Sequence, residues 1–319
     1  SFPDHSKELI YFLDDPRNGA PTFSILLLSK LISSKVKVAL TGLGGDELFA
    51  GYHVFKSFDY LDKLKKNPLQ IFSLINLFKS HEFFRGMYFV GFPFLDKEVR
   101  KTALFVVFNK SERKKLFTKN FYEKVKKYDP SNLEEVPKKS SFVEKAINTY
   151  IKIYLPTSLL VQDKMGMAHS IEARVPICDN ELLDFSLSLP MEQKLKKGEL
   201  KYIIKESMKP YLPKELYNKP KRGFSTPFAI WFKKELRSFL YGFLLEKRTV
   251  ERGIFNPKYV KKILDKYTKP SIDGPLSLIG VNKIWCLLQT ELWFRVFIDG
   301  EKDLLRKQNL SRFTNQIIN

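Results

Sequence analysis

The sequence predicts a mostly α-helical protein that opens with a small α/β portion. A short, β-branched and apolar run at 36–40 has the composition of a strand, and a glycine-rich turn follows it directly. From about residue 55 onward the strand signal fades and apolar residues recur at helical spacing. We therefore expect residues 1–57 to form an α/β portion and residues 58–319 a large helical body.

The α/β portion is expected to contain helices at 7–14 and 22–34, a strand at 36–40 and a helix that opens at 46–52. The order helix, strand, glycine turn, helix is typical of an α/β unit. Because the strand is apolar throughout, it is expected to be a buried parallel strand.

The helical body shows no repeat at a fixed period. Several of its segments end at or just before proline or glycine, which are common helix terminators. The expected helices are 55–80, 98–107, 111–127, 140–154, 180–189, 199–209, 227–247, 256–268 and 276–298.

Composition limits the classes of function. Hydrophobic residues make up 44% of the 319 residues and charged residues 28%, as in an ordinary globular protein. The net charge of +20 is compatible with nucleic acid, a membrane surface or an anionic substrate as partner. The basic residues are spread through the chain, which favours a solvated, lysine-rich surface, so we do not expect nucleic-acid binding.

The cysteines and histidines give no metal or disulfide pattern. Cys178 and Cys286 lie far apart, which argues against a disulfide framework and favours a reducing, cytoplasmic setting. The four histidines lack the HExxH spacing of zinc hydrolases. No membrane span is expected, because the longest apolar run, 86–95, is about half of the roughly 20 residues that a helical span needs.

The most informative stretch is the turn at 41–52, which reads T-G-L-G-G-D-E-L-F-A-G-Y. Glycines directly after a strand allow left-handed backbone and close approach of a ligand. The free N–H groups at the start of the next helix favour an anion, such as a nucleotide phosphate. The stretch is neither a Walker P-loop nor a G-x-G-x-x-G fingerprint.

Asp46 and Glu47 would repel a bare phosphate at this turn. A bridging Mg²⁺ removes the conflict, since carboxylate oxygens bind the metal and the metal binds phosphate. The alternative is that both carboxylates only complement the dipole of the following helix.

At this point the sequence resembles the glutamine-dependent asparagine synthetases, whose synthetase domain carries [ST]-G-x-G-G-D-E-L-F-x-G-Y after a strand. Four further landmarks follow the family order and, with the turn, span nearly the whole chain. They are Leu13–Pro16 (family L-D-E-P), Asp163–Pro176 with Asp179 (family D-R-x-x-M-A-x-x-x-E-x-R-x-P-x-x-D), Lys201 with 212–213 and 219–224 (family K…LP…RPKxGF), and Glu291–Trp293 (family E-L-W).

The resemblance implies a fold and a reaction. The fold would be part of an adenine-nucleotide α-hydrolase-like domain, of the PP-loop ATPase type, with residues 1–57 as a partial nucleotide-binding portion. ATP would activate the side-chain carboxylate of aspartate as an acyl-adenylate and release pyrophosphate. Ammonia derived from glutamine would then attack to give asparagine.

The resemblance also implies roles for individual residues. The glycine turn, through Thr41, Gly42, Gly44 and Gly45, would lie against the nucleotide. Asp46, with Glu47, would hold Mg²⁺ and pyrophosphate, and Lys201 would stabilise the charge that develops on the phosphates and the acyl centre. Lys164 stands where the family usually has arginine, and Lys164 and Lys221 would be further phosphate-binding cations.

Residue spacing supports some of these roles. Lys201 and Lys205 flank an apolar helix face of Leu200, Ile203, Ile204 and Met208, where a lysine can be partly desolvated; the alternative is two lysines snorkelling from a packed helix.

One further residue pair and one single residue are interpreted as architectural. Glu172 and Arg174 would share a face of an extended segment and form a buried ion pair that positions the loop before Pro176. Asp179 is expected to be an N-cap.

Three departures from the family matter. The upstream S-G-G-x-D-S pyrophosphate loop and the glutaminase domain do not occur in this sequence, and Leu43 stands where many members carry an acid. We therefore expect this chain to be a piece of a longer protein or one half of a split enzyme, whose other portion completes the sheet. Two alternatives stay open: a non-catalytic relative that uses a basic surface for binding, and an enzyme that forms another amide or a lactam.

Overall fold

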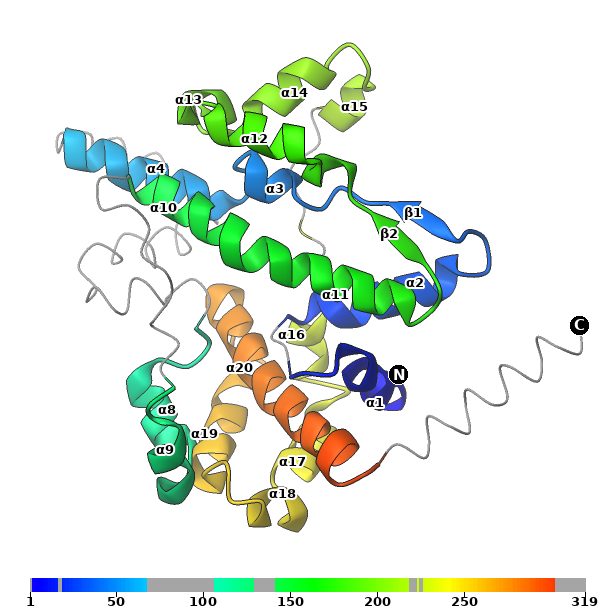
Figure 1. Ribbon diagram of the computed structural model, residues 1–319. Coiled ribbons are helices and arrows are strands. Elements are labelled where there is room, and N and C mark those ends of the chain that lie inside the picture. The colour runs from blue at the N-terminus through cyan, green and yellow to red at the C-terminus, as the bar shows by residue number, and fades with distance from the viewer. Residues whose placement is uncertain are drawn as a thin grey trace, which may run out of the picture.

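A computed structural model describes residues 2–16, 19–67, 106–128, 141–217, 223 and 226–301. The described residues are mostly helical, with two small two-stranded sheets (Figure 1). The expected fold class, mostly α with a small α/β portion, is confirmed. The division at residue 57 stays a prediction.

The α/β portion starts with two helices, α1 (Phe2–Leu13) and α2 (Pro21–Ile32), close to the expected ranges although α1 begins earlier. The helix expected over 46–52 is a single turn, α3 (Gly45–Leu48). It ends early because Ala50 adopts a left-handed φ of 56° and reverses the chain. The next helix, α4 (His53–Lys66), starts after this reversal.

Strand β1 (Val38–Leu40) pairs in parallel with β2 (Glu172–Arg174), in the register Val38–Glu172 and Leu40–Arg174. The expectation of a buried strand is wrong. Val38 is 39% exposed and Leu40 74%, and they share one face of the strand. In the described part of the chain only β2 pairs with β1, and the exposure of Val38 and Leu40 leaves this face of the strand largely open to solvent.

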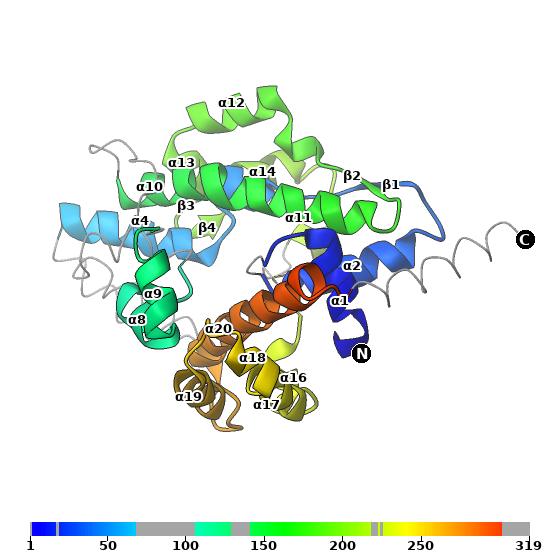
Figure 2. The same ribbon diagram turned by 60° about the horizontal axis from the view of Figure 1, so that its bottom comes forward.

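The longest helical stretch consists of α10 (Phe142–Thr149), a π-helical turn η3 (Tyr150–Tyr154) and α11 (Leu155–Met167). Helix α4 packs beside α10, while α11 lies on α1 and α2 (Figures 1 and 2). The sequence predicted helix only to residue 154. The π-helical turn lies just before Pro156, whose missing N–H interrupts the α-helical ladder, and the helix then continues.

Among the other elements, the predicted helices at 180–189, 256–268 and 276–298 agree with the structure. The expected helix over 111–127 divides where Thr118 caps a second helix, 199–209 opens with a strand, and 227–247 is broken into shorter helices. Of the expected helices, 98–107 and the end of 55–80 lie largely outside the described residues. The remaining elements are α8 (Lys110–Leu116), α9 (Lys119–Val125), η4 (Pro176–Cys178), α12 (Asn180–Ser188), α13 (Met191–Lys194), β3 (Leu195–Lys196), β4 (Glu199–Leu200), α14 (Tyr202–Met208), α15 (Lys214–Tyr217), α16 (Phe228–Trp231), α17 (Arg237–Leu244), α18 (Lys247–Glu251), α19 (Pro257–Tyr267), α20 (Gly274–Trp293) and η5 (Phe294–Ile298).

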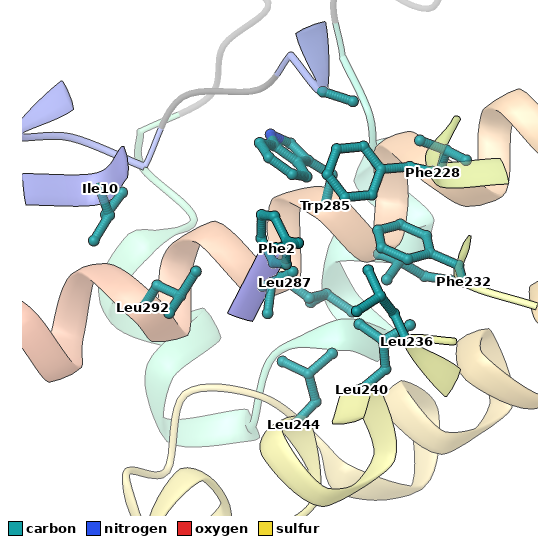
Figure 3. Close-up of a cluster of buried hydrophobic side chains, with 14 of the residues drawn as sticks. Phe2, Ile10, Phe228, Phe232, Leu236, Leu240, Leu244, Trp285, Leu287 and Leu292 are labelled. Atoms are coloured by element: carbon teal, nitrogen blue, oxygen red, sulfur yellow. The ribbon is translucent and has the colours of Figure 1, made fainter. Parts of the chain in front are cut away.

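The largest apolar core gathers around α20, where Trp285 is fully buried against Phe2 and Phe228 (Figure 3). A second core joins α4 to α10 and includes Ala50. A third, small cluster contains Leu48 and Phe49. Residues 48–50 therefore anchor the chain first in the third cluster and then in the second. This packing holds the segment after the glycine turn in place. None of the described helices has the length and apolar character that crossing a membrane requires.

Candidate functional site

The glycine turn joins β1 to α3. The Thr41 N–H donates to the carbonyl oxygen of Arg174 at 2.8 Å, so the turn starts where the β1–β2 ladder ends. Gly44 has a φ of 93°, which favours glycine. A Cβ on Gly44 would also lie 2.3 Å from the sulfur of Cys178 in η4, so η4 packs directly against the turn.

Asp46 and Lys201 meet beside this turn. The Nζ of Lys201 lies 2.7 Å from Oδ1 of Asp46, and the two side chains are 28% and 21% exposed. Lys201 follows β4 and precedes α14, with a left-handed φ of 56°. The pair is thus formed by residues far apart in sequence, and it keeps contact with solvent.

Lys201 brings positive charge to the turn. Its Nζ would lie 3.7 Å from a Cβ on Gly45. Helix α3 is one turn long, so its dipole is much weaker than the sequence suggested. Lys201 also precedes the helix rather than flanking its apolar face, because Leu200 belongs to β4.

The turn has an unsatisfied hydroxyl and open space. In the described part of the chain, the buried Oγ1 of Thr41 has no hydrogen-bond partner. A Cβ on Gly42 would meet no described atom within 4 Å. A buried hydroxyl without a partner is costly, and a bound polar ligand would satisfy it.

Glu47 lies in a different environment from Asp46. It is 1% exposed and accepts a hydrogen bond of 2.6 Å from the hydroxyl of Tyr52. The ring of Tyr52 packs against Tyr150 and Tyr154, with centroids 5.0 and 5.9 Å away. Burial, then Tyr154 and the Glu47 carboxylate, raise the pKa of Tyr52 far above its usual value. The carboxylate of Glu47 therefore points into the protein interior, unlike that of Asp46.

At the glycine turn, the carboxylate of Asp46 is the one that Mg²⁺ could reach. Among the residues described, no cluster of three or more histidine, cysteine or acidic side chains could enclose a metal. Mg²⁺ is often bound through one or two carboxylates, with phosphate oxygens and water as the other ligands. The partly exposed Asp46 and the unsatisfied Thr41 hydroxyl fit magnesium-bound phosphate; Glu47 would first have to leave Tyr52.

Lys164 is held at the end of α1. Its Nζ donates to the carbonyl oxygen of Leu13 at 2.9 Å and lies 2.5 Å from Oδ1 of Asp14. The indole N–H of Trp293 donates to the carbonyl oxygen of Asp14 at 2.8 Å. Three sequence landmarks therefore meet at this point, and the ammonium of Lys164 contacts α1 rather than the glycine turn.

Glu172 and Arg174 do pair, at 2.8 Å, but the expected burial is wrong. Their side chains are 58% and 60% exposed, because they project from a two-stranded sheet. Such an exposed pair contributes little to stability. The Asp179 side chain accepts from the N–H groups of Glu181 and Leu182, so the predicted N-cap is confirmed. Lys221 lies outside the described residues.

Some residues at the site carried no sequence signal. Tyr150 and Tyr154 are one helical turn apart, but only the fold brings them to Tyr52. Burial raises the pKa of the Cys178 thiol, as does Glu47, and burial raises the pKa of Cys286 to about 11. Neither cysteine is thus prepared to form a reactive thiolate.

Comparison with known proteins gives a consistent result. The sequence profile of one family, described as asparagine synthase, matches residues 1–295. A glutamine-hydrolyzing asparagine synthetase, number 1 of Bacillus subtilis (strain 168), is 26% identical over 306 residues, which cover 92% of this chain and 45% of the relative. Number 3 of the same organism is 24% identical over 303 residues, covering 92% and 44%.

A glutamine-hydrolyzing asparagine synthetase of Gallus gallus is also similar, with 28% identity over 194 residues, covering 56% of this chain and 33% of the relative. The chain spans less than half the length of each of these relatives.

Proposed function

This chain belongs to the asparagine synthase family, and we propose that it supplies part of the active site of a ligase that forms an amide at the expense of ATP. The observation that carries the proposal is the Asp46–Lys201 ion pair beside the glycine turn, 2.7 Å between charged atoms. A carboxylate for a metal and an ammonium for phosphate charge are what phosphate chemistry requires at such a turn.

The proposed reaction has two steps. A side-chain carboxylate oxygen of aspartate attacks the α-phosphorus of ATP, and pyrophosphate leaves with the electrons of the broken P–O bond. Ammonia, derived from glutamine, then attacks the acyl carbon; AMP leaves, a proton is lost, and asparagine is formed.

Each residue of the site has a proposed task. The hydroxyl of Thr41 and the backbone at Gly42, Gly44 and Gly45 would contact the nucleotide. Asp46 would bind Mg²⁺, which neutralises pyrophosphate charge when it is bound.

The lysines would stabilise negative charge. Lys201 would leave Asp46 and stabilise the charge on the transferring phosphorus and the leaving group. Lys164 and Lys221 stay predicted phosphate ligands, and Lys164 would have to release Asp14 to act in this way.

We also propose that residues outside this chain complete the sheet. Two observations support this: among the described residues only β2 pairs with β1, and Val38 and Leu40 are exposed, whereas a parallel strand normally lies in a wider sheet with both faces covered. An added segment, in the same or a partner chain, would carry the S-G-G-x-D-S loop and the glutaminase portion. The lengths of the relatives are consistent with such a segment.

Two measurements test the proposal. The protein with its sheet completed should exchange labelled pyrophosphate into ATP only when aspartate is present; no exchange, or exchange that ignores aspartate, would contradict the assigned reaction. Calorimetric titration of this chain alone with Mg-ATP should show only weak binding. Binding near micromolar affinity would show that the chain needs no further segment.

Two alternatives have support from specific observations. Leu43 packs against the cluster of Leu48 and Phe49 and offers no acid, so a related amide or a lactam is the second candidate product. Replacing ammonia by other amines in the exchange-competent protein separates these products. The +20 charge favours a non-catalytic binding module, whereas the Asp46–Lys201 contact argues against it.

A further inference from the structure

Gly51 lies directly beneath the Asp46–Lys201 pair. A Cβ on Gly51 would lie 2.0 Å from Oδ1 of Asp46 and 2.3 Å from Cε of Lys201. It would also lie 2.8 Å from the Cα of Asp46. All three separations are shorter than carbon contacts allow, so any side chain at position 51 must move at least one member of the pair.

The constraint is one of space rather than of backbone conformation. Gly51 is not among the glycines that adopt a left-handed φ. Its neighbour Ala50, fully buried, takes the left-handed conformation at 56° and turns the chain back. Gly51 then approaches Asp46 so closely that its N–H donates to the Asp46 carbonyl oxygen at 2.7 Å.

The next residue repeats this spacing. The hydroxyl of Tyr52 donates to Glu47, again five residues earlier, at 2.6 Å. The segment from Asp46 to Tyr52 is therefore closed by two contacts, one through backbone and one through side chains. Because Ala50 and Tyr52 on either side are packed into the α4–α10 core, Gly51 cannot move away to make room.

We propose that Gly51 is a positioning residue: the absence of a side chain there allows Lys201 and Asp46 to lie at ion-pair distance beside the glycine turn. The proposal rests on the function proposed above, since it concerns the same two charged groups. Position 51 would control the distance between the two charged groups. It would thereby also control where a metal-bound phosphate contacts both of them.

The first test measures the accessibility of Lys201 by chemistry that does not depend on activity. The chain is acetylated briefly, and the rate at Lys201 is compared by mass spectrometry with that at Lys205, which pairs with Glu199 at 2.9 Å. In Gly51→Ala the ratio of the two rates should rise about two- to fivefold, the range expected when a partly exposed ion pair is lost.

Two further variants calibrate this measurement. Asp46→Asn should raise the ratio similarly, because it removes the charge that holds Lys201. Gly242→Ala in α17 should leave it unchanged, since a Cβ there meets no described atom within 4 Å. An unchanged ratio in Gly51→Ala would overturn the proposal.

A double-mutant cycle keeps the proposal testable if Gly51→Ala folds poorly. Lys201→Ala removes the Cε that a Cβ at position 51 would meet, so Gly51→Ala should lower the urea midpoint less in that background. An equal shift in both backgrounds, or a double variant that also fails to fold, would place the constraint elsewhere and overturn the proposal.

The outcome is separable from that of the proposed function. If acetylation of Lys201 increases and aspartate-dependent pyrophosphate exchange is lost, both are supported. If acetylation increases while exchange persists, Gly51 does position the pair, but the pair is not what the reaction uses.

Discussion

Two adjacent carboxylates at the glycine turn have opposite surroundings. Asp46 pairs with Lys201 and keeps contact with solvent, whereas Glu47 is buried under Tyr52. Successive residues of a helical turn point about 100° apart, which separates the two side chains. The two carboxylates are chemically alike, so the sequence could not distinguish their roles. Of the two, only Asp46 lies where a metal-bound phosphate could reach it without repacking of the surrounding side chains.

Asp46→Asn should abolish pyrophosphate release in the protein with its sheet completed, because an amide binds Mg²⁺ far less well than a carboxylate. Folding should change little, since the side chain is not in an apolar core. The measurement is pyrophosphate release with thermal unfolding in parallel. Release at a rate near that of the unmodified protein would remove Asp46 from the proposed metal site.

Tyr52→Phe should lower stability by about 1–3 kcal/mol, because Glu47 stays buried and loses its donor. The effect should depend on pH. Burial raises the pKa of Tyr52, so the stability that its neutral form contributes is fully present below the unfolded pKa of about 10 and is lost as the pH rises beyond it.

Urea unfolding between about pH 8 and pH 11 checks this, since tyrosine titrates near 10 when exposed. The fall in stability at high pH should be shallower in Tyr52→Phe than in the unmodified protein. Tyr128→Phe, at an exposed tyrosine, is the matched control and should leave the curve unchanged. If stability falls with pH equally in all three proteins, the hydroxyl of Tyr52 does not contribute to stability in the way proposed.

At the scale of elements, the end of α20 is tied to its neighbours by charge. Glu291, 1% exposed, accepts two hydrogen bonds of 3.0 Å from Arg252, which follows α18, and one of 3.0 Å from Arg295 in η5. Arg252 also donates to Asp299 at 2.7 Å, as does Arg248. Glu291 of the E-L-W landmark therefore makes structural contacts at the end of α20.

Asp299→Asn should weaken the contacts between Arg248, Arg252 and the chain after η5, and so lower stability at neutral pH. It should also make stability less sensitive to acid. Hydrogen bonds from Arg252, and then from Arg248, lower the pKa of Asp299 from 3.8 to about 2. The stability they confer is therefore present above 3.8 and is lost as the pH falls toward 2. The urea midpoint at pH 7 should drop, and its further decline on acidification should be less steep.

The control for this experiment is Asp273→Asn, whose carboxylate is exposed beside Lys233. That substitution should shift the midpoint by no more than about 0.5 kcal/mol in equivalent free energy, as is usual at the surface. If Asp299→Asn shifts the urea midpoint as little as Asp273→Asn does, the arginine contacts at Asp299 do not stabilise this part of the fold.

Several of the longer elements were predictable, although α11 was not. The helices at 180–189, 256–268 and 276–298 give several periods of apolar residues, and the structure confirms them. α3, β3 and β4 span four residues or fewer, too short for a period to be read. The candidate site depends on these short elements, so its residue types were predictable from motifs, whereas the Asp46–Lys201 and Glu47–Tyr52 pairings needed the fold.

At the scale of the whole molecule, the described chain has substantial apolar cores yet leaves apolar side chains exposed around its small sheet. Leu28 and Leu31 are exposed near the end of α2, and Val38 and Leu40 on β1. The sequence predicted that another portion would complete the sheet, but it also predicted that the strand itself is buried. Composition could not reveal this difference, because a β-branched run looks the same whether its cover lies within the chain or outside it.

If a segment outside this chain covers that surface, Leu40→Lys should leave the chain folded and disable the completed protein. Leu40 is 74% exposed here, so the substitution should shift the thermal midpoint of this chain very little. In the completed protein the same lysine would be buried without a partner, which is strongly unfavourable. Leu278→Lys, at a partly exposed leucine of α20, is the matched control. Loss of pyrophosphate exchange in Leu40→Lys alone is the expected result, while full exchange in both variants would mean that water, rather than protein, covers β1.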